Sequence, residues 1–293
     1  MPVNEVFHPG GIEYYGDVNF LKGGIVYSDY VTTVSPRYAQ EIQTPEFGFG
    51  LDSLLRARRF FLAGILNGVD YAEWDPATDR HLPHNYTAET LEGKLACKKA
   101  LLEEFHLPTD QLTTRPLLGI VSRFAHQKGL DLVAECIPGY ADLGVQMVVL
   151  GSGDPGLERA FSGIANDRPH QFGFRSGYND GLAHRIEAGS DMFLMPSRYE
   201  PCGLNQIYSL KYGTVPVVRA VGGLDDTVTA DTGFKFFGST AHELYNCTNY
   251  AIGQFDDREE WELRMRRGMA LDFSWQVSAA QYVELYRRLR QAS

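Results

Sequence analysis

The stretch "DMFLMPSRYEPCGLNQIYSLKYG", residues 191–213, has the pattern of a strand, a turn and a helix. The apolar run at 191–197 is typical of a strand buried on both sides. Residues 204–213 have helical spacing, which stops at Gly213. A charged pair, a proline, a cysteine and a glycine therefore lie on a strand-to-helix turn. In an open parallel sheet, ligands bind at such turns.

The same alternation repeats from residue 116 onward. Strands are expected at 116–123, 145–154, 170–178 and 214–221, and helices at 129–144 (interrupted by Pro138), 155–167 and 180–190. Strands that alternate with helices of this length indicate βαβ units and a parallel sheet covered on both faces. The predicted fold class is α/β, with a Rossmann-like doubly wound parallel sheet in a domain over residues 116–274.

The flanking segments do not complete a second domain of this kind. Within residues 1–64 the pattern predicts one helix over 17–29, and one strand over 30–36 that ends in a turn at Ser35-Pro36. Residues 65–115 are expected to form a hinge and connecting segment. Residues 275–293 are expected to form a C-terminal helix that crosses towards the N-terminal lobe. Its aromatic and aliphatic face must pack either on the main domain or on a missing partner. That face consists of Trp275, Tyr282, Leu285, Tyr286 and Leu289.

Composition excludes several classes of protein. The 293 residues carry a formal net charge of −10 without a basic stripe, so nucleic acid and anionic membranes are not expected partners. The longest apolar stretch, 60–66, is too short to cross a bilayer, and the first residues lack the pattern of a signal peptide. The four cysteines and eight histidines are scattered without disulfide or metal-ligand spacing, which favours a cytoplasmic protein with no metal site.

The turn in the opening stretch offers groups that bind a phosphorylated sugar. The first amides of the following helix, at Gly203 to Asn205, have no intrahelical acceptor and suit a phosphate. Glu200 could accept hydrogen bonds from sugar hydroxyls. The alternative is an ordinary helix start, where an acidic residue is favoured by the helix dipole.

Two cations follow the first strand of the domain. Arg123 and Lys128 lie in "VSRFAHQKG", and the ends of neighbouring parallel strands meet at one edge of a sheet. Both could face the Glu200 turn and bind a diphosphate, with Arg as a planar fork and Lys as a point charge. The alternative is a pair of solvated surface cations. Cys202 near His126 could suggest a thiol nucleophile, but no third orienting group is evident.

Four motifs, in order, resemble bacterial glycogen synthase and plant starch synthase. They are "NFLKGGIVYSDYVTTVSPRYAQEI" (19–42), "VSRFAHQKGLDL" (121–132), "AGSDMFLMPS" (188–197) and "SRYEPCGLNQIYSLKYGTVPVVRAVGGLDDTV" (197–228). Members of this family are retaining glycosyltransferases with two Rossmann-like lobes, the GT-B arrangement. They transfer glucose from ADP-glucose to the non-reducing end of an α-1,4-glucan without a metal or other cofactor. The resemblance implies that residues 116–274 are the nucleotide-sugar-binding lobe and residues 1–64 a remnant of the N-terminal, acceptor lobe.

The resemblance also implies a role for each candidate residue. Arg123 and Lys128 would hold the diphosphate and neutralise the departing ADP, while Glu200 would contact the glucosyl ring. Cys202 would line the same pocket, and the backbone from Gly203 through Leu204 would cap the distal phosphate. Tyr178 matches the position where the family stacks an aromatic ring on adenine. Asn205 replaces the more usual threonine, and its amide can still donate a hydrogen bond.

Other family features are absent from the sequence. Many related retaining transferases outside this family carry a second glutamate eight residues after the first; here Tyr208 occupies that position, as this family tends to have it, so contacts to the ribose must come from elsewhere. Residues 1–64 contain no match to the family's acceptor site, its K-x-G-G-L loop or its sugar-facing histidine. We therefore expect a donor lobe that is inactive alone, with a missing N-terminal lobe or a second copy of the chain as partner. The alternatives are a non-catalytic nucleotide-sugar-binding or partner-regulating module, and a retaining transferase that uses UDP-glucose.

Overall fold

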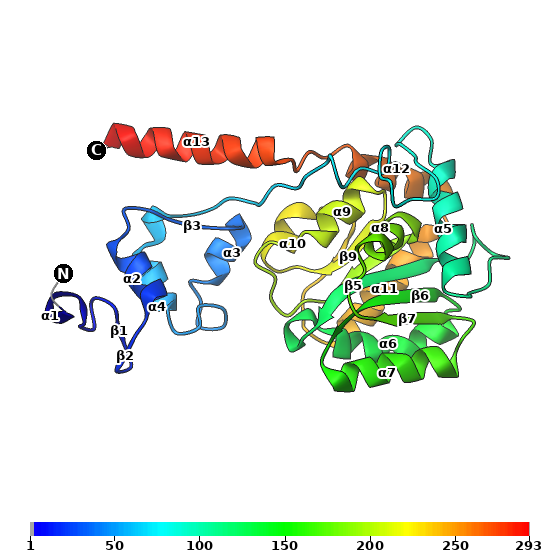
Figure 1. Cartoon of the computed structure of the whole chain (residues 1–293), viewed down its shortest axis with the longest axis horizontal. Helices are drawn as coiled ribbons and strands as arrows, with labels where there is room; N and C mark the ends of the chain where they lie inside the picture. Colours follow the sequence, from blue (N-terminus) through cyan, green and yellow to red (C-terminus); the bar gives the residue numbers. More distant parts are fainter. Residues whose placement is uncertain (1–2, 293) are drawn as a thin grey trace.

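Six parallel strands form the central sheet of the computed structural model, which describes residues 3–292 (Figure 1). The strands lie in the order β10 (Phe234–Phe236), β9 (Val215–Arg219), β8 (Met192–Met195), β5 (Leu117–Phe124), β6 (Gln146–Gly153) and β7 (Phe172–Ser176). The chain builds β5, β6 and β7 in one direction, then crosses back to β8 and continues outward on the other side of β5. Strand order therefore reverses between β5 and β8, which is a topological switch point. The predicted doubly wound parallel sheet is confirmed.

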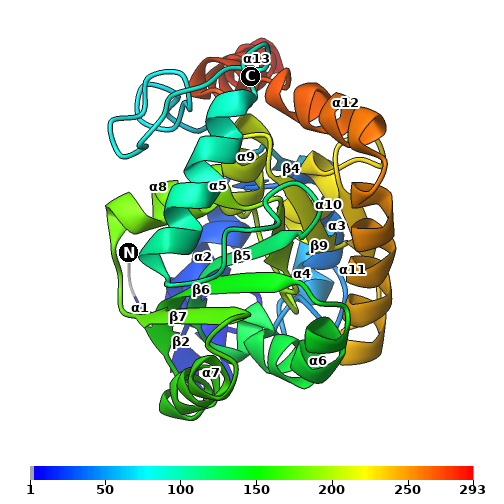
Figure 2. The same ribbon diagram turned by 90° about the vertical axis from the view of Figure 1, so that its right-hand side faces the viewer.

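Alternate residues of one strand enter two separate cores, as in a sheet buried on both faces. In β5, Leu118 and Ile120 join the core beneath one face, whereas Leu117 joins the core on the other face. Figure 2 shows helices on both sides of the sheet. The first core is covered by α6 (Leu130–Asp142), α7 (Pro155–Asp167), α11 (Ala241–Phe255) and α12 (Arg258–Met269). The second is covered by α5 (Glu92–Glu104), α8 (Asp180–Gly189) and α10 (Gly222–Thr227), and α9 (Asn205–Lys211) adjoins α8 and α10.

The leading segment is small and has its own core. It contains α1 (Val3–Val6), β1 (Glu13–Tyr14), β2 (Asp17–Val18), α2 (Phe20–Tyr27), β3 (Val31–Thr33), α3 (Pro36–Glu41), α4 (Asp52–Ala57), the 3-10 helix η1 (Arg59–Phe61) and β4 (Leu62–Gly64). Within residues 3–292, strands β3 and β4 pair only with each other, in parallel. Ile25, Leu51 and Leu55 form the buried centre of this segment.

Three local predictions need correction. Pro138 does not interrupt its helix, because α6 runs through it with Ile137 and Tyr140 buried on the packed side, and packing outweighs the one lost hydrogen bond. Ser35-Pro36 starts a helix, since the Ser35 side chain accepts a hydrogen bond from the amide of Tyr38 (2.9 Å) and proline suits the first helical position. The helix expected over 17–29 begins only at Phe20, after the Asn19 cap.

Helix α3 docks the leading segment on α10. The Glu41 carboxylate accepts hydrogen bonds at 3.1 Å to both of its oxygens from the amide of Gly222, the first residue of α10. Asp226 accepts bonds from the Ser35 hydroxyl (2.5 Å) and from the amide of Arg37 (2.9 Å). Burial raises the pKa of Glu41, although the Gly222 amide and Arg37 oppose this shift. The contact is therefore polar and rests on a few directed hydrogen bonds.

Helix α13 (Trp275–Ala292) extends back over the leading segment (Figure 1). Val69 and Ser274 form an isolated parallel bridge, and the Ser278 hydroxyl donates a hydrogen bond to the carbonyl of Leu66. Leu285 is buried, yet Tyr286 on the same predicted face is 60 % exposed. The apolar face of α13 is thus only partly covered. No described helix combines the length and apolar character needed to cross a membrane.

Candidate functional site

A cavity of about 630 Å³ opens at the carboxyl ends of β5, β6 and β8, at the topological switch point. Val34 of the leading segment and Asn67 of the connecting segment form part of its wall. All eight residues singled out from the sequence line it: Arg123, Lys128, Tyr178, Glu200, Cys202, Gly203, Leu204 and Asn205. The topology thus gathers into one cavity residues that are up to 82 positions apart, from 123 to 205.

The centre of the cavity is an ion pair. The Lys128 ammonium donates to Oε2 of Glu200 at 2.5 Å, and the Ser197 hydroxyl donates to the same oxygen at 3.0 Å. Glu200 is only 5 % exposed, so its charge depends on these partners. Among the described residues, Oε1 of Glu200 has no recorded hydrogen bond. That oxygen is available to a further donor.

Arg123 differs from Lys128 in having no such partner. Its side chain lines the cavity and is exposed, and among residues 3–292 no hydrogen bond or ion pair of its guanidinium is recorded. The expectation that both cations face Glu200 thus holds as a contact for Lys128 alone. An unpaired guanidinium beside a cavity is ready for a bidentate anion such as a phosphate.

Two adjacent glycines hold the turn that carries Glu200. The amide of Gly223 donates to the carbonyl of Glu200 at 3.1 Å. A Cβ on Gly222 would lie 1.9 Å from the Glu200 carbonyl oxygen, and one on Gly223 would lie 1.9 Å from the Cys202 carbonyl oxygen. Only glycine permits this approach. Gly222 and Gly223, which follow β9, therefore determine how the turn that lines the cavity is held, although they do not line it themselves. The sequence contains this signal, but residue patterns alone did not connect it to the Glu200 turn.

The start of α9 lies at the cavity wall, which residues 203–205 help to line. No backbone hydrogen bond is recorded for the amides of residues 203–206, within the part of the chain that the structure describes. Gly203 has a φ of +69°, a left-handed conformation that favours glycine. Asn205 directs its side-chain amide to the carbonyl of Val121 (2.9 Å), at the end of β5. One N–H of this amide thus ties α9 to the sheet.

Tyr178 and Cys202 both line the cavity, but Tyr178 is exposed and Cys202 is buried. Tyr178 is 83 % exposed, and its hydroxyl donates to Oδ1 of Asp180 at 2.8 Å, which raises the pKa of Tyr178. Its ring faces are free for stacking. Cys202 is buried, and burial raises the pKa of its thiol, which therefore stays neutral and is a poor nucleophile.

A second cavity of about 390 Å³ adjoins the first and shares Val121, Tyr178 and Asn205 with it. Its wall includes Trp74, whose ring stacks on Tyr208 with a centroid distance of 3.9 Å. It also includes Glu187, which is fully buried; burial raises the pKa of Glu187 to about 8. Sequence reasoning missed Trp74 and Glu187, because one lies in an irregular loop and the other in a helix that was read only for its apolar pattern.

Comparison with known proteins places both parts of the chain in related families. A family model described as the starch synthase catalytic domain matches residues 1–57. A second model, described as glycosyl transferases group 1, matches residues 115–251. Residues 58–114 lie between the two matches and include most of the connecting segment.

Relatives align along nearly the whole chain. A glycogen synthase of Anaeromyxobacter sp. (strain Fw109-5) is 52 % identical over 97 % of this chain and 61 % of its own length. The structure of the catalytic domain of starch synthase IV from Arabidopsis thaliana, bound to ADP and acarbose, superposes with a TM-score of 0.91 at 37 % identity. That match covers 98 % of this chain and 62 % of the other. A sucrose-phosphate synthase from Thermosynechococcus elongatus, at 21 % identity and TM-score 0.62 over 91 % of this chain and 59 % of that chain, shares the fold. The chain thus spans about three fifths of the length of these relatives.

Proposed function

Because the chain belongs to the glycogen and starch synthase family, we propose that it is the donor-binding part of an ADP-glucose-dependent glucan synthase. In the complete enzyme, glucose would pass from ADP-glucose to the non-reducing end of an α-1,4-glucan with retention of configuration. One observation carries the proposal: the cavity at the switch point of the sheet gathers Arg123, Lys128, Glu200 and the free amides after Gly203.

The two cations would act on the diphosphate in different ways. Arg123 is unpaired and could take two phosphate oxygens with its fork, at no cost of breaking an existing bond. Lys128 already neutralises Glu200, so an incoming diphosphate would share its ammonium with that carboxylate. The amides of residues 203–205 would add uncharged donors. Together these groups would stabilise the negative charge that develops on the departing ADP.

Glu200 and Tyr178 would position the two ends of the donor. The free Oε1 of Glu200 would accept a hydrogen bond from a glucosyl hydroxyl, while Lys128 holds Oε2. The exposed ring of Tyr178 would stack on the base. Transfer would proceed by front-face attack, with the leaving phosphate taking the proton of the acceptor 4-hydroxyl. Cys202 would line the pocket without reacting.

Catalysis would need a second wall for this cleft. Of the described residues 3–64, Val34 alone lines the cavity, and several aromatic side chains of this segment are exposed. We therefore propose that this chain alone binds the donor but does not elongate glucan. An N-terminal lobe, on the same polypeptide or another one, would complete the site and hold the acceptor. The free state of all four cysteines supports a cytoplasmic setting.

A second candidate concerns the donor base. Tyr178 can stack on uracil as well as adenine, so UDP-glucose is the alternative donor. The bound ADP in the Arabidopsis relative supports ADP-glucose. The incomplete second wall favours one further alternative, a module that binds nucleotide sugars or regulates a partner without catalysis.

Calorimetric titration of the purified chain with ADP, ADP-glucose and UDP tests the proposal. We expect ADP to bind with micromolar to millimolar affinity and more tightly than UDP. Arg123→Ala should weaken ADP binding about 10- to 100-fold, the value of one or two charged hydrogen bonds. Arg159→Ala, on the exposed surface of α7, is the charge-matched control and should bind normally. Unchanged affinity in Arg123→Ala, or tighter binding of UDP, would contradict the proposal.

A further inference from the structure

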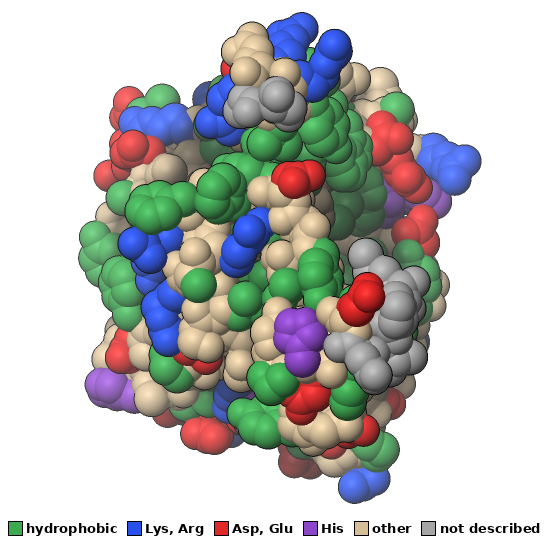
Figure 3. Space-filling model, turned by 90° about the vertical axis from the view of Figure 1, so that its left-hand side faces the viewer, with side chains coloured by type: hydrophobic (Ala, Val, Ile, Leu, Met, Phe, Trp, Pro, Cys, Tyr) green, Lys and Arg blue, Asp and Glu red, His purple; other side chains and the backbone are tan. Residues whose placement is uncertain are grey.

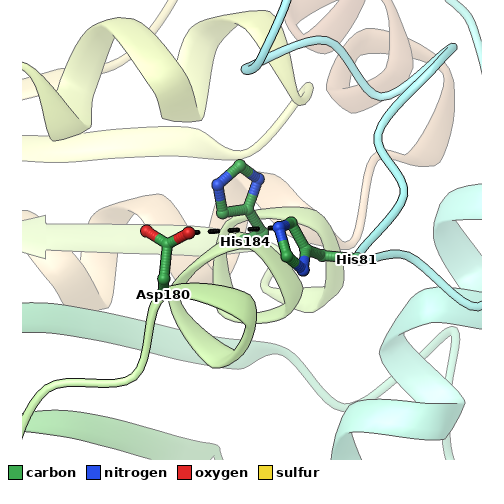
Figure 4. Close-up of side chains that lie close together, drawn as sticks. All are labelled: His81, Asp180 and His184. Carbon is green, nitrogen blue, oxygen red and sulfur yellow. Dashed lines mark ion pairs between the residues drawn. The ribbon is translucent and has the colours of Figure 1, made fainter.

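Three side chains from two distant segments converge beside the second cavity, whose wall includes Asp180 (Figure 4). Asp180 and His184 lie four residues apart on α8, and His81 comes from the connecting segment. One potential ligand atom of each lies within 4.8 Å of the others. We propose that His81, Asp180 and His184 form a binding site for a divalent cation of the Zn²⁺ type. The proposal does not depend on the donor or on the reaction.

His184 is arranged as a metal ligand usually is. It is fully buried, and its Nδ1 lies 2.7 Å from Oδ2 of Asp79, which also accepts a hydrogen bond from the Tyr212 hydroxyl (2.6 Å). A carboxylate at Nδ1 fixes the tautomer that leaves a lone pair on Nε2. That Nε2 atom is buried and has no recorded partner among the described residues. An oriented imidazole with an unused acceptor is the independent sign that a ligand fits there.

The same Asp79 also positions His81. Its Oδ1 accepts a hydrogen bond from the His81 amide at 2.8 Å, so one carboxylate orients both histidines. The His81 ring packs over α8 at Gly181, where a Cβ would meet its Nδ1 at 3.1 Å. The His81 and His184 rings have centroids 4.7 Å apart. A glycine at this position thus gives the second imidazole room beside the first.

Asp180 can ligate a cation without losing its other contact. Its Oδ1 accepts the Tyr178 hydroxyl, whereas its Oδ2 lies 3.9 Å from Nε2 of His81. In a tetrahedral Zn²⁺ site with bonds near 2.0 Å, ligand atoms lie about 3.3 Å apart, so the cluster must contract. His81 and Asp180 are partly exposed and can move, while His184 stays fixed. Water would supply the fourth ligand.

Two neighbouring positive side chains, Arg80 and Arg185, oppose the cation. The guanidinium nitrogen Nε of exposed Arg80 lies 3.5 Å from Nε2 of His81, the limit of a hydrogen bond, and must turn away when a metal binds. Arg185 also approaches, since one of its nitrogens lies 3.2 Å from a Cβ placed on Gly181. Binding therefore competes with these positive side chains. The cation would fasten the connecting segment to α8.

Co²⁺ titration of the untagged full chain tests the site, because tetrahedral Co²⁺ absorbs strongly in the visible range. Trp74 stacks on His184 at 3.6 Å between centroids, so bound Co²⁺ should also quench its fluorescence. We expect one Co²⁺ per chain, displaced by Zn²⁺, with both signals. Zn²⁺ should also raise the melting temperature.

Variants distinguish this site from casual binding by surface histidines. His81→Ala should lower affinity at least 10-fold and abolish the quenching of Trp74. Asp180→Asn should weaken binding less severely, and Arg80→Ala should tighten it about 2- to 3-fold. His170→Ala, at an exposed position away from the cluster, should bind as the unaltered chain does. Absence of stoichiometric Co²⁺ binding, or equal binding by His81→Ala and the unaltered chain, would overturn the proposal.

Discussion

The large domain and the leading segment have very different structures. The domain between β5 and α12 closes a six-stranded sheet with helices on both faces, and its central strands are almost entirely buried. The leading segment, residues 3–64, has a two-stranded parallel sheet and a core of a few residues. The inner strands of the first piece have a neighbour on each side and are covered on both faces, whereas each of the two strands in the small parallel sheet of the second has one recorded neighbour.

Large apolar side chains that are exposed in the leading segment illustrate the difference between the two pieces. In the leading segment Tyr15, Phe20, Phe49 and Phe60 are between 67 % and 87 % exposed. On the face that carries this segment, hydrophobic side chains lie in several adjacent groups (Figure 3). Exposed apolar groups of this kind mark surfaces that another structure covers. The same argument applies to the partly covered face of α13.

The largest expected effect contrasts one buried and one exposed phenylalanine. Phe193 in β8 is fully buried, whereas Phe20 in α2 is 82 % exposed. Phe193→Ala should lower the free energy of unfolding by about 3–5 kcal/mol, because it leaves a cavity in the core. Phe20→Ala should change it by less than about 0.5 kcal/mol. Denaturant unfolding of both variants measures this, and equal effects would remove the contrast between the two pieces.

Replacing the two cations of the cavity one at a time should distinguish an effect on stability from an effect on ADP binding. Lys128→Ala leaves the Glu200 carboxylate buried beside Ser197 alone, so it should cost about 2–4 kcal/mol of stability as well as ADP affinity. Arg123→Ala removes no recorded contact and should reduce ADP affinity with stability unchanged. Thermal unfolding combined with calorimetry distinguishes the two. Equal loss of stability in both variants would mean that Arg123 has a structural role.

Glu187 gives the stability of the buried domain a pH dependence. Its pKa is about 8 in the folded chain, against 4.5 for the free side chain, because burial disfavours the charge. Between these values the folded state holds the extra proton, so stability should fall as pH rises. Glu187→Gln should match the unaltered chain near pH 5 and exceed its stability by about 1–3 kcal/mol near pH 7.5. Unfolding free energies at both pH values measure this. Parallel pH curves for the two proteins would contradict it.

The smallest expected effect concerns the contact between α3 and α10, which joins the leading segment to the large domain. Glu41→Ala removes both acceptors of the Gly222 amide and should weaken docking of α3 on α10 by about 1 kcal/mol. Hydrogen exchange should quicken in residues 31–64 and stay unchanged in β5 and β6. Glu46→Ala, at an exposed position of the same segment, is the control. Faster exchange throughout the sheet would show that the joint supports the whole domain.

The sequence predicts the domain well because its signals are local and repeated. Continuous apolar strands such as 192–195, each followed by a turn and a helix, leave few alternatives to a parallel sheet. Arg123, Lys128, Glu200 and the residues at 203–205 could be found because strand-to-helix turns at one sheet edge meet by topology, whereas Tyr178 and Cys202 became candidates for this pocket through the family resemblance. All of them line one cavity.

Contacts that span long separations were not predictable in this way. Ser35-Pro36 is a helix start whose cap could have been recognised, but its bond to Asp226 crosses 191 positions. Asp79, His81 and His184 come together only because the connecting segment folds back on α8. Scattered histidines therefore gave no metal-ligand spacing in the sequence, although three potential ligands meet in space.

The central claim is that donor binding is complete in this chain while catalysis is not. Incorporation of labelled glucose from ADP-glucose into glycogen, measured on a preparation already shown to bind ADP, tests it most directly. We predict no elongation above the level of an Arg123→Ala, Lys128→Ala control. Sustained elongation by the chain alone would contradict the account, because residues 3–64 would then supply a working acceptor wall.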